Sequence, residues 1–228
     1  MNNVELTSTI TDVVYDINRV GTISVYMTIP SLSGEVINIP YNSKLYLNDT
    51  VHLVNDAHGV VVKEITRNTN SKEILLPTNC PYCNSELNGL KCTNFNCSGV
   101  LEKEIIGYLS YLGIHLLTPK YIEKLIDKAL LLCHADLYHL TVENLMCVDI
   151  NIKLAKSIVT SINNTIGIKL TKVLKALDLH GIKYKSLQLK DKTYAEVIDI
   201  LCEESPLVEE TITRDSLNAL VSLVKPII

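Results

Sequence analysis

The sequence predicts an α+β protein of three consecutive modules: a β-rich N-terminal part, a short cysteine-rich segment and an all-α C-terminal part. Three observations support this order. Residues 1–76 alternate short runs rich in Val, Ile, Thr and Tyr with turn-forming residues. Four of the seven cysteines then lie between residues 80 and 97. From residue 101 onward, apolar residues recur at i, i+3, i+4 and i+7, the spacing of amphipathic helices.

Residues 1–76 are expected to form a small closed β-barrel. The runs that predict strands are TITDVVYDI, GTISVYMTI, GEVINIPY, DTVHLV and GVVVKEITR. They are separated by Gly21 and by the turn-forming stretches 31–34, 41–44 and 47–49. Short strands at near-regular spacing suit an OB-fold. Another small β-barrel or sandwich fits the same pattern.

Residues 77–100 contain the pattern C-x2-C-x8-C-x4-C, formed by Cys80, Cys83, Cys92 and Cys97. Two close pairs of thiolates on tight turns can surround one Zn2+ as a tetrahedron, which leaves no coordination position for a substrate. A module this short lacks an apolar core, so the metal must supply much of its folding free energy, on the order of 10 kcal/mol for structural zinc. Zinc is favoured over iron because the site is all-thiolate and shows no redox context. Two disulfides or four free thiols are the alternatives.

The remainder of the chain is predicted to be helical. The amphipathic runs are LEKEIIGYLSYLGI, PKYIEKLIDKALLLC, ADLYHLTVENL, KLAKSIVTSINN and KLTKVLKAL, and TYAEVIDILCEES and TRDSLNALVSLVKP continue the pattern. Breaks are expected at Thr118–Pro119, His134–Ala135 and Asp149–Asn151. Because Cys133, Cys147 and Cys202 lie in these apolar patterns, we expect them to be small buried hydrophobic residues.

Composition restricts the function. The net charge of -4 and the pI of about 5.9 give no overall basic field, so any phosphate contacts must come from local clusters and helix N-termini. The six histidines are scattered, and no nucleophile–base pair can be identified. The N-terminus lacks the features of a signal peptide, and no apolar stretch is long enough to span a bilayer. We therefore expect a cytoplasmic protein with no membrane partner.

The segments LLPTNCPYC (75–83) and KCTNFNCSG (91–99) together resemble the zinc finger of NAD-dependent bacterial DNA ligases. Upstream, residues 12–36 are similar to the start of the OB domain of that family, through Arg19, Gly21 and Gly34. Downstream, residues 114–141 and 148–164 resemble its first two helix–hairpin–helix units. The resemblance implies an OB-fold over 1–76, a four-cysteine zinc finger over 77–100 and a helix-hairpin-helix domain over 101–228.

The resemblance also implies a function. In that family a lysine of a Lys-x-Asp-Gly motif attacks NAD, and AMP then passes to the 5′-phosphate at a nick. This sequence contains no Lys-x-Asp-Gly. The resemblance therefore implies a DNA-binding, non-nucleotidyl subunit that is inactive alone. It would act on nicked duplex DNA with a separate adenylation subunit that uses NAD, as in the split ligases of some phages. A stand-alone zinc-containing nucleic-acid-binding protein and a structural interaction module are the alternatives.

Helix–hairpin–helix units normally carry glycines between their helices, so that backbone N–H groups can approach phosphate. Here Leu116 and Thr118 stand at these positions in the first hairpin, and Cys147 and Asn151 in the second. Thr118 and Asn151 are expected to cap the helices that follow, and Asn151 also tolerates a left-handed backbone.

Six residues are candidates for DNA contact. Lys120 and Lys153 stand where the family often has lysine, and Lys156 lies one helical turn beyond Lys153. The N–H groups of Lys120 and Tyr121 are expected to be free at the start of their helix. In the β-rich part, the Arg-x-Gly motif is intact. Asn55, Asp56 and His58 stand where the family has a basic turn, and His58 and Lys63 are expected to substitute for that turn in part. A solvated loop is the alternative. The DNA-binding candidates are therefore Arg19, Gly21, Lys63, Lys120, Lys153 and Lys156.

Overall fold

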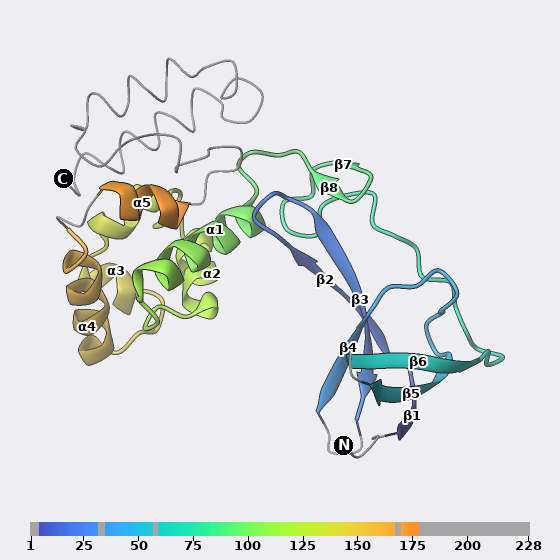
Figure 1. Cartoon of the computed structure of the whole chain (residues 1–228). Helices are drawn as coiled ribbons and strands as arrows, with labels where there is room; N and C mark the ends of the chain where they lie inside the picture. The colour runs from blue at the N-terminus through green and yellow to red at the C-terminus, as the bar shows by residue number, and fades with distance from the viewer. Residues whose placement is uncertain (1–4, 32–34, 57–58, 167–169, 178–228) are drawn as a thin grey trace. The chain divides into compact units, whose positions relative to one another are not determined.

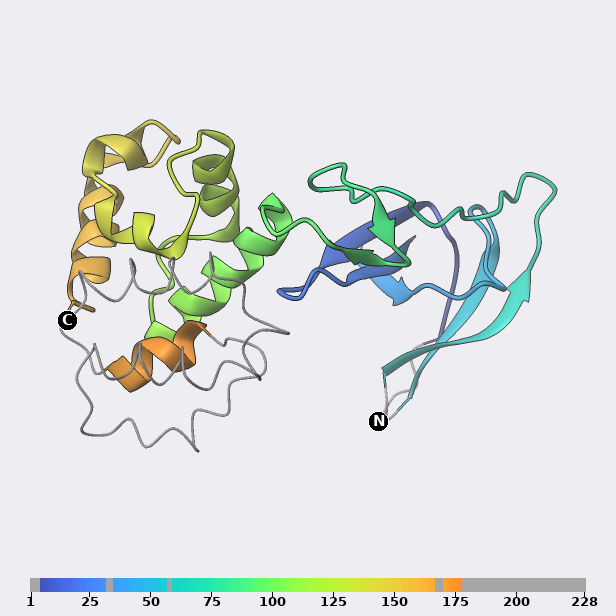
Figure 2. The same cartoon turned by 90° about the horizontal axis from the view of Figure 1, so that it is seen from above.

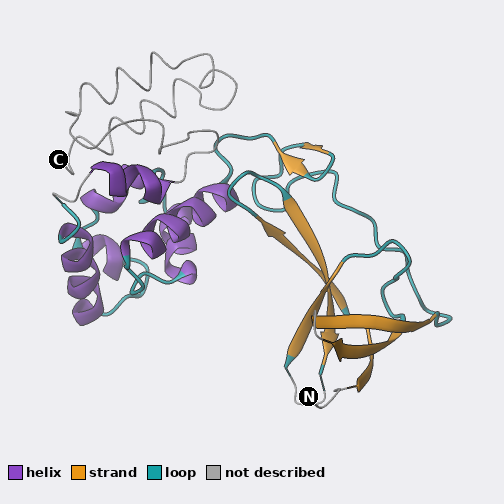
Figure 3. Ribbon diagram, in the orientation of Figure 1, coloured by secondary structure: helices purple, strands orange, loops and turns teal. Residues whose placement is uncertain are grey.

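The computed structural model describes residues 5–31, 35–56, 59–166 and 170–177 (Figure 1). The chain divides into two compact units, Met1–Val100 and Leu101–Ile228, and this boundary falls inside helix α1 (Ser98–Leu112). The first unit holds strands and the cysteine-rich segment, and the second holds helices (Figure 3). The predicted helices beyond residue 177, together with Gly34, His58 and Cys202, lie outside the described residues.

The strands of the first unit form two antiparallel three-stranded sheets. Their orders are β1-β5-β6 and β2-β3-β4. The strands are β1 (Glu5–Thr9), β2 (Asp12–Ile17), β3 (Ile23–Pro30), β4 (Val36–Pro40), β5 (Thr50–Asp56) and β6 (Gly59–Thr66). All five predicted runs contain a strand. The sequence did not predict β1 as a separate strand because only Leu6 of its five residues is buried, so the apolar alternation is weak.

The chain passes from one sheet to the other between Ile10 and Thr11. The Ile10 N–H donates to the Asp49 carbonyl at 2.9 Å, next to β5, whereas the Thr11 N–H donates to the Thr28 carbonyl of β3 at 2.9 Å. One interrupted strand, β1 followed by β2, therefore pairs with both sheets. Their shared core consists of Leu6, Ile10, Met27, Ile29, Ile39, Leu45, Val51, Leu53 and Ile74. Burial of these apolar side chains drives the two sheets together.

A buried carboxylate joins the loop before β5 to the segment after β6. Asp49 is fully buried, and it accepts hydrogen bonds from Arg67 Nε at 2.8 Å, the Ser71 hydroxyl at 2.6 Å and the Tyr46 N–H at 2.9 Å. The Arg67 guanidinium also lies 3.4 Å from the centre of the Tyr46 ring and donates to the Lys44 carbonyl. A buried carboxylate is stable only with such partners, so this network fixes the two segments together.

The second unit is helical. Its elements after α1 are α2 (Pro119–Asp127), the 3-10 helix η1 (His134–His139), α3 (Val142–Met146), α4 (Ile152–Asn163) and α5 (Leu170–Leu177). The prediction of one helix through residue 133 was wrong, because α2 ends at Asp127 and Ala129 adopts a left-handed φ of 53°. The predicted run 135–145 is divided in two, because Thr141 caps α3 through its hydroxyl.

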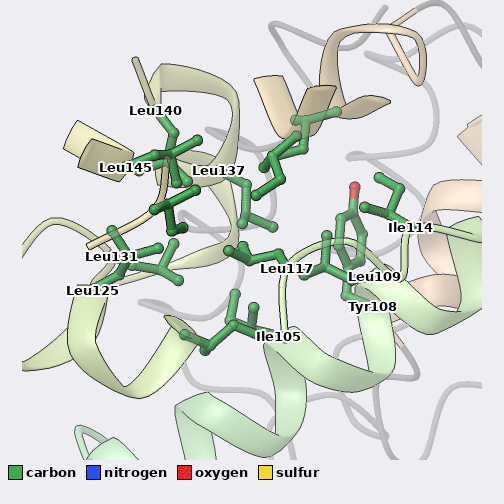
Figure 4. Packing of buried hydrophobic residues seen from close by; sticks show 14 of the residues in the cluster. Ile105, Tyr108, Leu109, Ile114, Leu117, Leu125, Leu131, Leu137, Leu140 and Leu145 are labelled. Atoms are coloured by element: carbon green, nitrogen blue, oxygen red, sulfur yellow. The ribbon is translucent and has the colours of Figure 1, made fainter. Parts of the chain in front are cut away.

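The helices enclose a core that draws residues from every one of these elements. Its labelled members in Figure 4 are Ile105, Tyr108, Leu109, Ile114, Leu117, Leu125, Leu131, Leu137, Leu140 and Leu145. The Tyr108 hydroxyl is hydrogen-bonded to that of Tyr138 at 2.8 Å, which in turn is 3.1 Å from the Thr165 hydroxyl. Burial, together with the hydroxyl of Tyr138, raises the pKa of Tyr108. The buried phenol is therefore neutral and paired.

Two other expectations concern the helical unit. Cys133 is half-buried, but Cys147 is exposed at the C-terminus of α3, so the prediction that it is buried was wrong. Among the residues that the structure describes, none of the helices combines the length and apolar character that crossing a bilayer requires.

Candidate metal centre and nucleic-acid-binding residues

The four clustered cysteines converge on one point. Their Sγ atoms all lie within 4.8 Å of one another. Cys80 Sγ is 3.8 Å from Cys97 Sγ, and Cys83 Sγ is 3.6 Å from Cys92 Sγ. A zinc ion with four Zn–S bonds of about 2.3 Å places its sulfurs about 3.8 Å apart, so the two measured pairs fit tetrahedral coordination. The cluster could hold one zinc ion.

Two tight turns bring these thiols together. In the first, Asn84 adopts a left-handed φ of 58° and its N–H donates to the Cys80 carbonyl at 2.8 Å. In the second, the Asn94 side-chain carbonyl accepts from the Asn96 N–H at 3.0 Å, and the Cys97 N–H donates to the Asn94 carbonyl at 3.2 Å. The asparagines thus shape both of the tight turns that carry the thiols.

A short hairpin carries the third cysteine. It consists of β7 (Leu87–Asn88) and β8 (Lys91–Cys92), with Gly89 in the turn at a φ of 64°. The hairpin lies beside the turn between β2 and β3 in both views (Figures 1 and 2). The Ile23 N–H donates to the Leu90 carbonyl at 2.8 Å, and the Cys92 N–H donates to the Gly21 carbonyl at 2.9 Å. The cysteine segment is therefore joined to β3 by backbone hydrogen bonds.

Gly21 is required by this junction. It has a φ of 80°, and a Cβ atom built on it would lie 2.6 Å from the Cys92 carbonyl oxygen. No side chain fits at that distance, and the left-handed backbone also favours glycine. The intact Arg-x-Gly motif thus has a packing reason that is independent of any contact with DNA.

The thiols differ in acidity because their surroundings differ. Burial raises the pKa of Cys97 to about 12 and also raises the pKa of Cys92. Burial acts in the same direction on Cys83, but hydrogen bonds with Ser85 and Asn94 outweigh it and lower the pKa of that thiol to about 6. A bound cation favours the thiolate form of every ligand. The site is therefore suited to a metal that displaces protons on binding.

The DNA-binding candidates are distributed over both units. Arg19 and Gly21 lie in the turn between β2 and β3, and Lys63 is exposed on β6. Lys120 is exposed in the first turn of α2, whereas Lys153 and Lys156 are exposed in the first two turns of α4.

The helix starts agree with the predicted caps in part. Thr118 precedes α2 with Pro119 in the first turn, but its side chain makes no capping bond, and the Tyr121 N–H donates to the Thr118 carbonyl at 3.0 Å. The expectation that this N–H is free was therefore wrong. Asn151 caps α4, because its side-chain carbonyl accepts from the Leu154 N–H at 3.0 Å.

In the second hairpin the left-handed residue is Asp149, and not Cys147 or Asn151, which stand at the positions that the resemblance gives to glycine. Cys147 and Asn151 have φ angles of -62° and -66°, whereas Asp149 has a φ of 67°. Asp149 therefore takes the conformation that a glycine would favour in this loop. Its carboxylate contacts Lys124 of α2 with an O–N distance of 2.6 Å.

The contact between Lys124 and Asp149 points to charged residues that the sequence analysis did not name as candidates. Lys124 and Lys128 were not among the candidates, although the spacing of four residues from Lys120 to Lys124 and on to Lys128 puts all three on one face of α2 and its C-cap. That spacing was the available signal. Asp149 carried no comparable signal, because only the folded hairpin shows its backbone conformation.

No protein-family model matches the chain. Individual proteins do match. The chain is 30% identical to a DNA ligase of Desulforapulum autotrophicum over 83% of its own length and 31% of that protein. It is 29% identical to a DNA ligase of Helicobacter pylori and 26% identical to one of Levilactobacillus brevis, over 68% and 70% of its length and 27% and 25% of theirs. The chain spans about three tenths of the length of these curated relatives.

Proposed function

We propose that this chain is the DNA-binding, non-nucleotidyl subunit of an NAD-dependent DNA ligase. It would hold nicked duplex DNA while a separate adenylation subunit carries out the NAD chemistry. The observation that carries the proposal is the similarity to DNA ligases over 68–83% of this chain. The converging cysteine cluster, in the segment where the resemblance to NAD-dependent ligases is most specific, supports it.

The fold of each part has a place in this proposal. The six strands form an OB-type barrel, and one interrupted strand pairing with both sheets supports this assignment. The pairs α1–α2 and α3–α4 act as helix–hairpin–helix units, and the capped start of α4 supports that assignment. The four cysteines hold a structural zinc ion, which supplies no reactive ligand position.

Such a subunit needs to position DNA rather than to move protons. The first N–H groups of a helix have no partner within it, and they carry a partial positive charge that attracts phosphate. At α4 these are the N–H groups of Ile152 and Lys153, with the Lys153 and Lys156 side chains beside them. Lys120 adds charge at the start of α2. Arg19 and Lys63 would contact DNA from the β-rich unit.

Nick sealing with a partner tests the proposal. The purified chain is mixed with an adenylation polypeptide of an NAD-dependent ligase, NAD, magnesium and a duplex that has one nick with a 5′-phosphate and a 3′-hydroxyl. We expect no sealing by either protein alone and sealing by the mixture, measured as conversion to the continuous strand on a denaturing gel. Sealing by this chain alone would contradict the proposal, as would failure with every such partner.

A stand-alone nucleic-acid-binding protein is the second candidate, and one observation favours it. Phe95, the single phenylalanine of the chain, is 87% exposed on the second cysteine turn, where its ring could stack on an unpaired base. This candidate predicts tighter binding to single strands than to nicked duplex in a titration without any partner. The ligase proposal predicts the reverse order of affinities.

A further inference from the structure

One carboxylate of the hairpin between α3 and α4 contacts a face of α2 and its C-cap that carries three lysines. Lys120, Lys124 and Lys128 are spaced four residues apart, so their side chains leave the helix on one face. Lys124 Nζ donates to Asp149 Oδ2 at 2.6 Å. The hydrogen bond and charge of Lys124 lower the pKa of Asp149, and the charges of Lys128 and Lys120 act in the same direction. The charges of all three lysines thus act on the carboxylate of Asp149.

The local fold does not require that this anion be present. The backbone of Asp149 closes the loop through its N–H, which donates to the Met146 carbonyl at 3.1 Å. Capping of α4 is performed by Asn151 instead. Asparagine and glycine adopt the left-handed conformation at least as readily as aspartate. The turn therefore does not account for an acidic side chain at position 149, whereas the contact with Lys124 does.

The contact is of a kind that another anion can replace. The side chain of Asp149 is 83% exposed and that of Lys124 is 34% exposed, so solvent screens their attraction. A phosphodiester group also carries one negative charge on two oxygens that accept hydrogen bonds from an ammonium group. In duplex DNA several such groups lie close together, so the three lysines could contact more than one.

We propose that Asp149 is an internal competitor for the DNA backbone: its carboxylate occupies the place of a phosphate group among Lys120, Lys124 and Lys128 and weakens the hold of this surface on duplex DNA. This inference rests on the proposed function, because it takes duplex DNA to be the partner. Phosphate binding must displace the carboxylate from Lys124. Removal of the charge of Asp149 leaves the same lysines available from the start.

The test is the affinity of the full chain for a continuous duplex, measured by fluorescence anisotropy at several salt concentrations. Asp149→Asn keeps the size of the side chain and suits the turn. We expect it to bind about twofold to fivefold more tightly than the wild type, because the exposed ion pair with Lys124 no longer has to be broken. Asp149→Gly should give the same gain.

Two matched variants separate this effect from a general change in charge. Glu123→Gln removes one negative charge from α2 three residues from Lys120, but among the described residues Glu123 makes no hydrogen bond or ion pair with the three lysines. It should raise the affinity less than Asp149→Asn does. Lys124→Met in the Asp149→Asn background should remove the gain. Circular dichroism of each variant checks that the helices are retained.

Several results would overturn the inference: an affinity of Asp149→Asn that equals or falls below that of the wild type, an equal gain from Glu123→Gln, or no binding of duplex DNA by any of these proteins. The measurement uses neither a partner nor a nick, so it is separate from the sealing assay. Tighter binding by Asp149→Asn with no sealing under any condition would leave this inference in place and overturn the ligase proposal.

Discussion

Single residues determine how the cysteine segment meets the strands, and Gly21 shows this most directly. Its carbonyl accepts the Cys92 N–H at 2.9 Å, while its Cα faces the Cys92 carbonyl so closely that a Cβ would stand 2.6 Å from that oxygen. Gly89, in the turn of the β7–β8 hairpin, is also left-handed, but a Cβ there would meet nothing within 4 Å. A comparison of substitutions at these two glycines therefore distinguishes the effect of a left-handed backbone from the effect of steric crowding.

We predict that Gly21→Ala destabilises the zinc-bound form by about 3 kcal/mol, since backbone strain and a displaced β8 both contribute. Gly89→Ala, the control, should cost only about 1 kcal/mol, because it adds strain alone. Urea-induced zinc release from the full chain, followed with a chromogenic indicator, measures both. Equal losses for the two variants would show that crowding at Cys92 has no part in stability.

At this scale, the sequence predicted residues whose role depends on near neighbours in the chain. The cysteine spacing identified all four members of the cluster, and Asn151 was expected to cap α4. Asp149 and Lys124 could not be found in this way, because they are 25 residues apart and meet only when α2 packs near the hairpin. Cys147 lies in an apolar run but at the end of a short helix, where its side chain is exposed.

At the scale of the elements, the positions of the strands and long helices could be predicted from sequence periodicity, whereas the residues at which they end could not. The runs in β2 to β6 alternate well enough to be predicted, but β1 is held mainly by pairing with β5, a contact that local pattern does not encode. The end of α2 depends on the left-handed Ala129, a residue type that ordinarily favours helix. The OB-type and helix–hairpin–helix assignments remain proposals.

The cysteine segment is the element for which metal removal has the largest expected effect. We predict one zinc ion per chain at pH 8 and its loss on acidification, because the thiolates must be protonated as the metal leaves. Acidification is expected to release the metal because burial raises the pKa of Cys92 and of Cys97, so that these two thiols take up protons readily once the metal has left. Equilibrium dialysis with zinc analysis from pH 8 to pH 5 measures this. Absence of bound zinc at pH 8 would contradict the assignment.

For the whole molecule, the proposed function divides ligation into two steps, formation of the AMP adduct on the partner and sealing of the nick. The two steps can be measured independently. Cys80→Ser removes one thiolate from the cluster and should disorder the cysteine segment, which lies in the first unit just before its boundary with the second along the chain. We predict that it abolishes supported nick sealing while the partner still forms its AMP adduct from NAD. Glu73→Gln, an exposed change outside the helical unit, serves as a control that retains sealing. Loss of adduct formation with Cys80→Ser would instead indicate that this chain takes part in the NAD step.

The strand that changes sheets at Ile10 also has a consequence for the order of folding. The β2-β3-β4 sheet joins strands that are neighbours in the chain, whereas β1 pairs Glu5 with Val54 and must close a long loop. Long loops cost more entropy, so we expect β1 to add last. The hydrogen bonds that join the cysteine segment to the strands go to Tyr15 of β2, to the β2–β3 turn and to the start of β3. Zinc uptake during refolding should therefore precede hydrogen-exchange protection of β1, and the metal would bind before the two sheets are joined.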